Sequence, residues 1–141
     1  MERIRNKVFS VEEANRLIPY LEATLRSLSD LARDIVATQR EISVLSVIEG
    51  SGATDGSADV RELRGKETGI ARIAERFRAL LDDLGSRGCI VRDLDLGLVD
   101  FYTMSGGRVV YLCWRRGETH IGHWHPLDEG FSGRRSLDEL P

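Results

Sequence analysis

The stretch Arg108-Val-Val-Tyr-Leu-Cys-Trp-Arg115 lies between two pairs of turn residues, Ser105-Gly106 and Arg116-Gly117. Runs of this length that are rich in β-branched and aromatic residues are typical of strands. Two-residue loops that contain glycine favour tight turns between antiparallel strands. We therefore predict that this stretch is the middle strand of a sheet, with a hairpin on either side.

A period of two, which is the pattern of strands, continues on both sides of the middle strand. The strands that it predicts are Cys89–Asp93, Leu98–Thr103, Arg108–Arg115 and Glu118–Trp124. They form a small antiparallel β-meander of three to four strands within residues 89–125, and residues 126–141 follow as a C-terminal tail. Before Gly88 the apolar residues recur at spacings of three and four, which is typical of helices. The predicted fold is a single α+β domain spanning residues 1–141.

Residues 10–84 have the pattern of a long antiparallel helical hairpin. The segment Ser10-Val-Glu-Glu13 matches a capping box, so we expect the first helix to begin there. Pro19 lacks an N–H, which predicts a kink or a break. Residues 49–58 contain three glycines and no periodic apolar residue, and we interpret them as a linker or hairpin tip.

Each predicted helix carries a mainly apolar seam with alternating spacings of three and four, as in coiled coils. The seams consist of Ile18, Leu21, Leu25, Leu28, Ala32, Ile35, Gln39 and Ile42, and of Val60, Leu63, Glu67, Ile70, Ala74, Phe77, Leu81 and Leu84. Further apolar residues lie outside the seams, namely Leu17, Leu31, Val36, Ile73 and Leu80. They favour the pairing of two hairpins into a four-helix bundle, so we expect a homodimer formed through the helical hairpin. We interpret the polar Gln39 as a residue that sets the register.

Composition excludes several classes of protein. The 20 Lys and Arg residues and 23 Asp and Glu residues give a net charge of −3 and are evenly spread, so no basic surface for nucleic acid is expected. The sequence has no apolar stretch of 18 or more residues, so no membrane span is expected. The first residues do not resemble a signal peptide, so the expected compartment is the cytoplasm. Cys89 and Cys113 do not have the spacing of a zinc finger and are expected to be reduced thiols.

The hairpin loops also predict which side chains share a face of the sheet. In the predicted register Asp100 pairs with Tyr111 and Val110 pairs with His123, so His123 and His125 fall toward one edge of the core face. The opposite, polar face carries Leu98, Asp100, Tyr102, Val109, Tyr111, Cys113, His120 and Trp124, with Glu118 at the turn. Such a mixture is typical of a small-ligand pocket, although an ordinary half-exposed face covered by the tail has the same pattern.

All three histidines of the chain, His120, His123 and His125, fall within six residues. His123 and His125 lie two residues apart, which suits two imidazole ligands on one strand, and Asp128 or Glu129 could add an oxygen ligand. This set predicts a site for a divalent transition metal such as zinc or iron. His120 points to the other face and joins the set only if a bulge reverses the alternation. Structural histidines without a metal are the alternative interpretation.

The tail stretch Asp128-Glu-Gly-Phe-Ser-Gly-Arg-Arg135 combines turn glycines with two neighbouring arginines. Guanidinium groups hold carboxylates or phosphates through paired hydrogen bonds. Arg134 therefore either binds an anionic small ligand or forms an ion pair with an acidic residue of the same chain, and we expect the internal ion pair.

A set of motifs occurs in a fixed order along most of the chain: Phe9, Glu13-Ala-Asn15, Gly97-Leu-Val-Asp-Phe101, Tyr111-Leu-Cys-Trp114, Gly117-Glu118, Trp124-His125 and Gly130-Phe-Ser-Gly-Arg134. This set resembles the bacterial family called domain of unknown function 2203. The resemblance implies a helical hairpin with a small sheet, and it implies no activity. The positions that match the pattern of the family are Asp100, Glu118, Trp124, His125, Phe131 and Arg134. Because His120 and His123 depart from it, the resemblance favours a site around Asp100, Glu118, His125 and Arg134.

Two functional hypotheses remain open. The first is a homo-oligomeric module without catalysis, whose sheet face holds a protein segment or an anionic small ligand. The second is a metal-binding protein or metal-dependent enzyme, in which His125 and His123 bind a divalent ion with an acidic residue. In a variant of the second hypothesis, Glu118 and His125 exchange a proton with a substrate.

Overall fold

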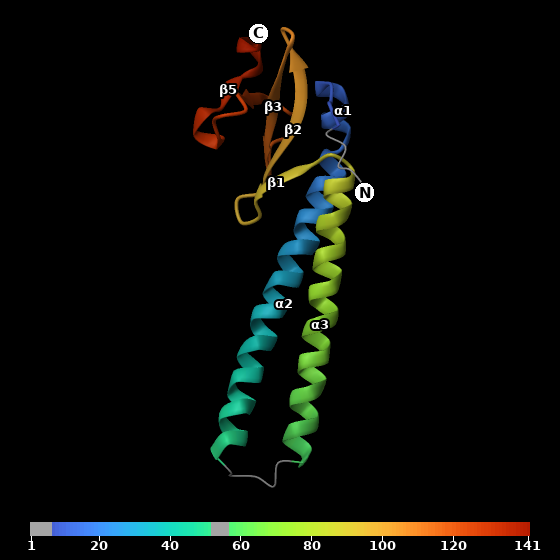
Figure 1. Cartoon of the computed structure of the whole chain (residues 1–141), viewed down its shortest axis with the longest axis vertical. Helices are drawn as coiled ribbons and strands as arrows, with labels where there is room; N and C mark the ends of the chain where they lie inside the picture. Colours follow the sequence, from blue (N-terminus) through green and yellow to red (C-terminus); the bar gives the residue numbers. More distant parts are fainter. Residues whose placement is uncertain (1–6, 52–56) are drawn as a thin grey trace. The chain divides into compact units, whose positions relative to one another are not determined.

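The computed structural model describes residues 7–51 and 57–141, and Figure 1 shows helices followed by an antiparallel sheet. The helices are α1 (Val11–Arg16), α2 (Ile18–Ser51) and α3 (Ser57–Ser86), and the strands are β1 (Ile90–Asp93), β2 (Leu98–Ser105), β3 (Arg108–Arg115), β4 (His123–His125) and β5 (Arg135–Ser136). The predicted α+β class is confirmed. The strands are five rather than three to four because two tail residues add β5 to the edge of the sheet.

The chain divides into two compact units. The sheet unit comprises the described residues 7–26 and 81–141, and the helical unit comprises the described residues between 27 and 80. In the described part of the chain, no helix is both long enough and apolar enough to cross a membrane.

The local sequence explains where the first two helices begin. Ser10 Oγ accepts the N–H of Glu13 at 3.0 Å, and the Glu13 carboxylate accepts the N–H of Ser10 at 2.9 Å, which confirms the capping box. α1 ends at Arg16 and α2 begins at Ile18, one residue before Pro19. A proline in the first turn of a helix needs no intrahelical N–H partner, so the expected break is found directly before it.

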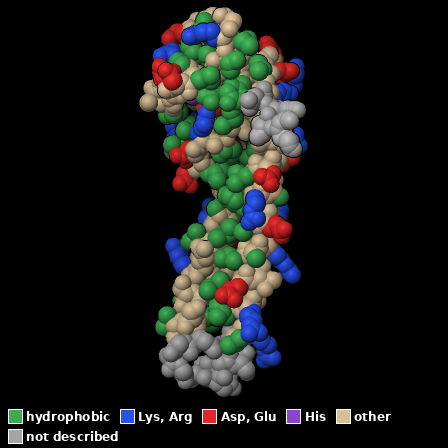
Figure 2. All heavy atoms as spheres, in the orientation of Figure 1, with side chains coloured by type: hydrophobic (Ala, Val, Ile, Leu, Met, Phe, Trp, Pro, Cys, Tyr) green, Lys and Arg blue, Asp and Glu red, His purple; other side chains and the backbone are tan. Residues whose placement is uncertain are grey.

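The helical unit buries few of its side chains. Among its described residues only Leu28 and Leu31 are buried. The apolar residues that are half-buried are Ala32, Ile35, Ile42, Leu45, Val60, Leu63, Ile70, Ile73, Ala74, Phe77 and Leu80. Figure 2 shows apolar side chains of this unit open to the surroundings on the face in view. The two long helices therefore leave much of their apolar surface without cover from the residues that the structure describes.

At two positions, the half-buried residue of the helical unit lies one residue before the predicted seam position. Thr38 is half-buried where Gln39 was expected, and Gln39 is exposed. Lys66 is half-buried where Glu67 was expected, and its Nζ lies 2.6 Å from Glu41 Oε1. A straight α-helix has 3.6 residues per turn, so it drifts away from a strict coiled-coil repeat. The single chain thus leaves Gln39 outward, and its role as a register residue stays a prediction.

The predicted linker of residues 49–58 is too long. α2 continues to Ser51 and α3 begins at Ser57, so helix covers both ends of the predicted linker. Its remaining residues, 52–56, lie outside the described part of the chain. Glycine and serine lower helix propensity by about 1 kcal/mol or less each, which the neighbouring helical turns can offset.

β2 and β3 pair two residues away from the predicted register. Asp100 lies opposite Cys113 rather than Tyr111, because the turn is Gly106-Gly107, where the glycines have positive φ values of 59° and 79°. A shift of two residues leaves each side chain on the same face of the sheet. The predicted polar face of these two strands is therefore retained.

β3 and β4 pair three residues away from the predicted register. His123 lies opposite Cys113 rather than Val110, because β4 begins only at His123 and the residues just before it do not pair with β3. An odd shift moves every side chain to the other face. His123 and His125 therefore lie on the polar face, and their predicted placement toward the core face is wrong.

The opposite face of the sheet is the core face. Trp124 lies opposite Leu112 on this face, although it was expected on the polar face. The Trp114 indole N–H donates to the carbonyl of Glu118 at 2.9 Å, which holds the turn after β3 in place. The largest fully buried apolar side chains of the sheet unit are Trp114, Phe101, Leu21, Leu25, Leu84, Leu112, Ile121 and Val99.

Candidate functional site

The polar face of the sheet gathers titratable side chains from its three central strands. They are Asp100 and Tyr102 on β2, Tyr111 and Cys113 on β3, and His123 and His125 on β4. A cavity of about 350 Å³ adjoins this face. It is lined by Arg92, Leu98, Asp100, Cys113 and His125 from the strands, and by Leu127, Asp128, Glu129, Gly130 and Phe131 from the segment after β4.

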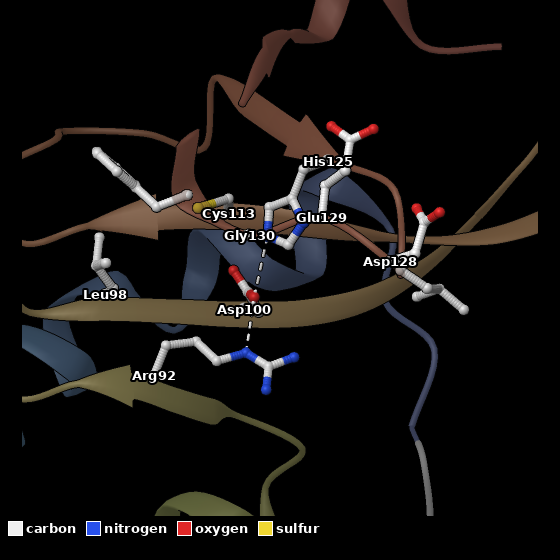
Figure 3. A pocket seen from close by; sticks show the side chains of 10 residues that line it. Arg92, Leu98, Asp100, Cys113, His125, Asp128, Glu129 and Gly130 are labelled. Carbon is white, nitrogen blue, oxygen red and sulfur yellow. Dashed lines mark hydrogen bonds and ion pairs between the residues drawn. The ribbon is translucent and has the colours of Figure 1, made fainter. Parts of the chain in front are cut away.

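Asp100 lies at the centre of this site, between the side chains of His125 and Arg92 (Figure 3). Its Oδ2 accepts a hydrogen bond from Arg92 Nε at 3.0 Å and lies 3.1 Å from His125 Nε2. The side chains of Asp100 and His125 are each 2% exposed, so the pair is shielded from water. The Arg92 guanidinium also lies over the ring of Tyr111, 4.8 Å from its centroid.

His125 has a hydrogen-bond acceptor at each of its ring nitrogens. Nδ1 lies 2.9 Å from the carbonyl oxygen of Pro126, and Nε2 lies 3.1 Å from the Asp100 carboxylate. A neutral imidazole has only one N–H and can donate to only one of these oxygens. The other contact requires a further positive charge, which is either a proton shared by the pair or a bound cation.

The second carboxylate oxygen of Asp100, Oδ1, is buried and has no hydrogen-bond partner. Buried polar atoms are nearly always hydrogen-bonded, and leaving one without a partner costs on the order of 1–3 kcal/mol. Because Asp100 lines the cavity, a molecule or ion in the cavity can supply the missing partner. The Cys113 thiol beside Asp100 is a further, weak donor to its carboxylate.

Cys113 lies beside this pair on the neighbouring strand and is buried. Burial, followed by the nearby Asp100 carboxylate, raises the pKa of the Cys113 thiol to about 12, so the thiol is neutral near pH 7. One ligand atom each from Asp100, Cys113 and His125 lies within 4.8 Å of the others. Among the described residues, these three are the group whose potential metal-ligand atoms lie close together. His123 and Asp128, which were predicted to bind the metal with His125, do not belong to this group.

A second polar cluster lies around Glu118. Its carboxylate accepts from Arg134 at 2.7 Å and from the Arg115 N–H at 2.8 Å, and it lies 3.8 Å from His123 Nδ1. Burial alone would raise the pKa of Glu118, but the bonds from Arg134 and the Arg115 N–H outweigh burial and lower it. The expected internal ion pair of Arg134 is confirmed. Glu118 thus approaches His123, and the proton exchange predicted between Glu118 and His125 has no direct contact to support it.

The remaining predicted site residues lie around the cavity or away from it. The Tyr102 ring packs against the Tyr111 ring with centroids 5.0 Å apart. His120 is exposed and Trp124 lies on the core face, so neither lines the cavity. Of the polar cavity residues, Arg92 was missed, and Cys113 was placed on the polar face but not among the candidate ligands. Their signal in the sequence was the period-two pattern, which places both on strands, but no spacing links either of them to Asp100.

A family model described as "Uncharacterized conserved protein (DUF2203)" matches residues 7–137, which is nearly the whole chain. The chain belongs to this family, as the resemblance in its motifs implied. Neither a curated protein nor a solved structure matched the chain.

Proposed function

We propose that this member of the DUF2203 family is a binding module whose sheet unit takes up a small ligand with a positive charge or a hydrogen-bond donor. The observation that carries the proposal is the buried Asp100 Oδ1, which lacks a partner and belongs to a residue that lines a cavity. A ligand that donates to this oxygen gains a charge-assisted hydrogen bond in a dry site, where such bonds are strong.

The charges around the cavity favour a cationic ligand over an anionic one. Asp100, Asp128 and Glu129 line the cavity, and Glu129 is paired with Arg135. Arg92 is the lining residue with a positive charge and already donates to Asp100. Arg134, the expected anchor of an anionic ligand, is engaged by Glu118 at 2.7 Å. An anionic ligand is therefore the competing outcome of the binding experiment.

The experiment is an NMR titration of the full chain, in which the imidazole resonances of His125 are followed and those of exposed His120 serve as the internal reference. The added compounds are methylammonium, methylguanidinium, acetate and inorganic phosphate. We expect the cations to shift the His125 resonances and Asp100→Asn to abolish the shift. Asp95→Asn, which removes an exposed carboxylate, is the matched control and should leave the shift unchanged. Shifts caused by acetate or phosphate alone would contradict the proposal.

We further propose that α2 and α3 pair as an antiparallel hairpin and that two copies of this hairpin form a homodimer. The ion pair between Glu41 and Lys66 supports the hairpin, because it joins the two helices. The half-buried apolar residues of the helical unit support a second copy, since their remaining apolar surface would gain roughly 25 cal/mol for each Å² that a partner covers.

Light scattering coupled to size-exclusion chromatography tests the homodimer. The full chain should elute with twice the mass of one chain, 15.8 kDa. Ile42→Lys, which places a charge at a half-buried position, should shift the mass toward that of a monomer, whereas Ser46→Lys at an exposed polar position should not. A monomer at high concentration for the unchanged chain would exclude the dimer.

Cytoplasmic location stays a prediction, consistent with two free buried thiols, Cys89 and Cys113.

A further inference from the structure

We infer that the positively charged ligand of the sheet unit is a divalent zinc ion held by Asp100, Cys113 and His125. This inference rests on the proposed function, because it identifies the ligand of the same cavity. It replaces the metal site predicted from His123, His125 and Asp128 with a different set, which the register of the strands brings together.

The donor atoms suit zinc in kind and in number. Zinc is bound in proteins by imidazole nitrogen, thiolate sulfur and carboxylate oxygen, with bond lengths of about 2.0–2.3 Å. Ligand atoms around such an ion are separated by roughly 3–4 Å, and the three candidate atoms lie within 4.8 Å of one another. A small closing movement of the side chains would therefore complete the coordination. Three protein ligands leave a fourth position for water, and the cavity beside Asp100 provides space for it.

The surrounding hydrogen bonds orient two of the three ligands. In a neutral imidazole, a hydrogen bond from Nδ1 to the Pro126 carbonyl, at 2.9 Å, requires the N–H on Nδ1 and leaves the lone pair of Nε2 toward Asp100. A backbone carbonyl at the second nitrogen is a common companion of metal-binding histidines. Arg92 holds Asp100 by Oδ2, and Oδ1 is the oxygen that has no partner. The zinc ion would satisfy this oxygen and would remove the conflict between the two facing acceptors.

Cys113 supplies the softest of the three ligands. Its neutral thiol would lose a proton to solvent when the sulfur binds the ion, so one proton is released for each zinc ion bound. Cys89 is also buried and free, but it does not belong to the converging group. The chain thus contains a matched control for the cysteine.

The test uses the full chain without a histidine tag and Co²⁺ as a coloured substitute for zinc. We expect one equivalent of Co²⁺ to produce the charge-transfer absorption of a cobalt–thiolate bond and Zn²⁺ to remove it by competition. Cys113→Ser should abolish this absorption, and Cys89→Ser should retain it. Asp100→Asn and His125→Gln should weaken Zn²⁺ binding at least about tenfold, whereas His123→Gln should change it less than about twofold.

Several results would overturn the zinc site. They are a wild-type protein without the thiolate absorption at one equivalent of Co²⁺, an absorption that depends on Cys89, or an equal loss of affinity in His123→Gln and His125→Gln. Circular dichroism shows whether each variant folds. If Cys113→Ser does not fold, the zinc site is judged from the cobalt–thiolate absorption of the wild-type protein and the Zn²⁺ affinity of His125→Gln. If Co²⁺ and Zn²⁺ do not bind but methylguanidinium shifts the imidazole resonances of His125, the zinc site is excluded and the proposed binding site for a cationic ligand is retained. If neither binds, both fall.

Discussion

Glu118 offers a test of how the tail stabilises the sheet unit. Glu118→Gln preserves the shape of the side chain but removes the charge that faces Arg134 at 2.7 Å. The side chain of Arg134 is 12% exposed and that of Glu118 is 27% exposed, so the pair is only partly screened by water. A hydrogen bond to a charged group contributes about 1.5–3 kcal/mol, and glutamine keeps a single acceptor oxygen. We therefore expect the free energy of unfolding to fall by about 1.5–3 kcal/mol at pH 7.

The assay is urea unfolding followed by the fluorescence of the buried tryptophans, Trp114 and Trp124. Glu129→Gln is the matched control, because Glu129 pairs with Arg135 but both side chains are more than one third exposed. Exposed ion pairs contribute about 0–1 kcal/mol, so this variant should lose less than about 1 kcal/mol.

The pH dependence of the same measurement follows from the lowered pKa of Glu118. Its ionised carboxylate stabilises the folded chain above the unfolded pKa of about 4.3, and this stabilisation is lost as the pH falls through the lower folded pKa. The difference between the wild-type protein and Glu118→Gln should therefore shrink in acid. Equal losses in Glu118→Gln and Glu129→Gln, or a difference that stays constant down to acidic pH, would refute the reasoning.

Three further predictions concern other positions of the chain. Gly97 has a φ of +71°, and a Cβ there would lie 2.4 Å from Arg116 Cβ, so Gly97→Ala should lower the free energy of unfolding by more than about 1 kcal/mol in urea. Gly85→Ala, in the last turn of α3 with nothing within 4 Å, should raise it by about 0.5–1 kcal/mol, and a loss there would contradict the argument. Burial and the hydrogen bond to Asp83 raise the pKa of Tyr20 to about 12, so the associated stability is present below pH 10 and is lost as the pH rises toward 12. An ultraviolet titration should therefore lose a tyrosine ionisation near pH 12 in Tyr20→Phe, and a Tyr20 that titrates near pH 10 would exclude this environment.

The order of helices and strands could be predicted because it depends on local patterns. Ser10 and Glu13 cap the first helix through atoms only three residues apart, and Pro19 breaks the helix by its own covalent geometry. The polar face of β2 and β3 could also be predicted, since a register error of two residues does not change the face of a side chain. Asp100 was therefore placed on the correct face of the sheet, and its role as a site residue, which the family resemblance also favours, stays a prediction.

The composition of the site could not be predicted, because it depends on how many residues of the segment before β4 pair with β3. The sequence by itself determined the helix starts, the strand positions and the face of Asp100, all of which follow from interactions within a few residues. Only the tertiary structure decided that β4 begins at His123, which turns His125 toward Asp100 and Cys113. The physical reason is that strand parity is set by long-range hydrogen bonds, and a shift by an odd number of residues exchanges the two faces of a strand.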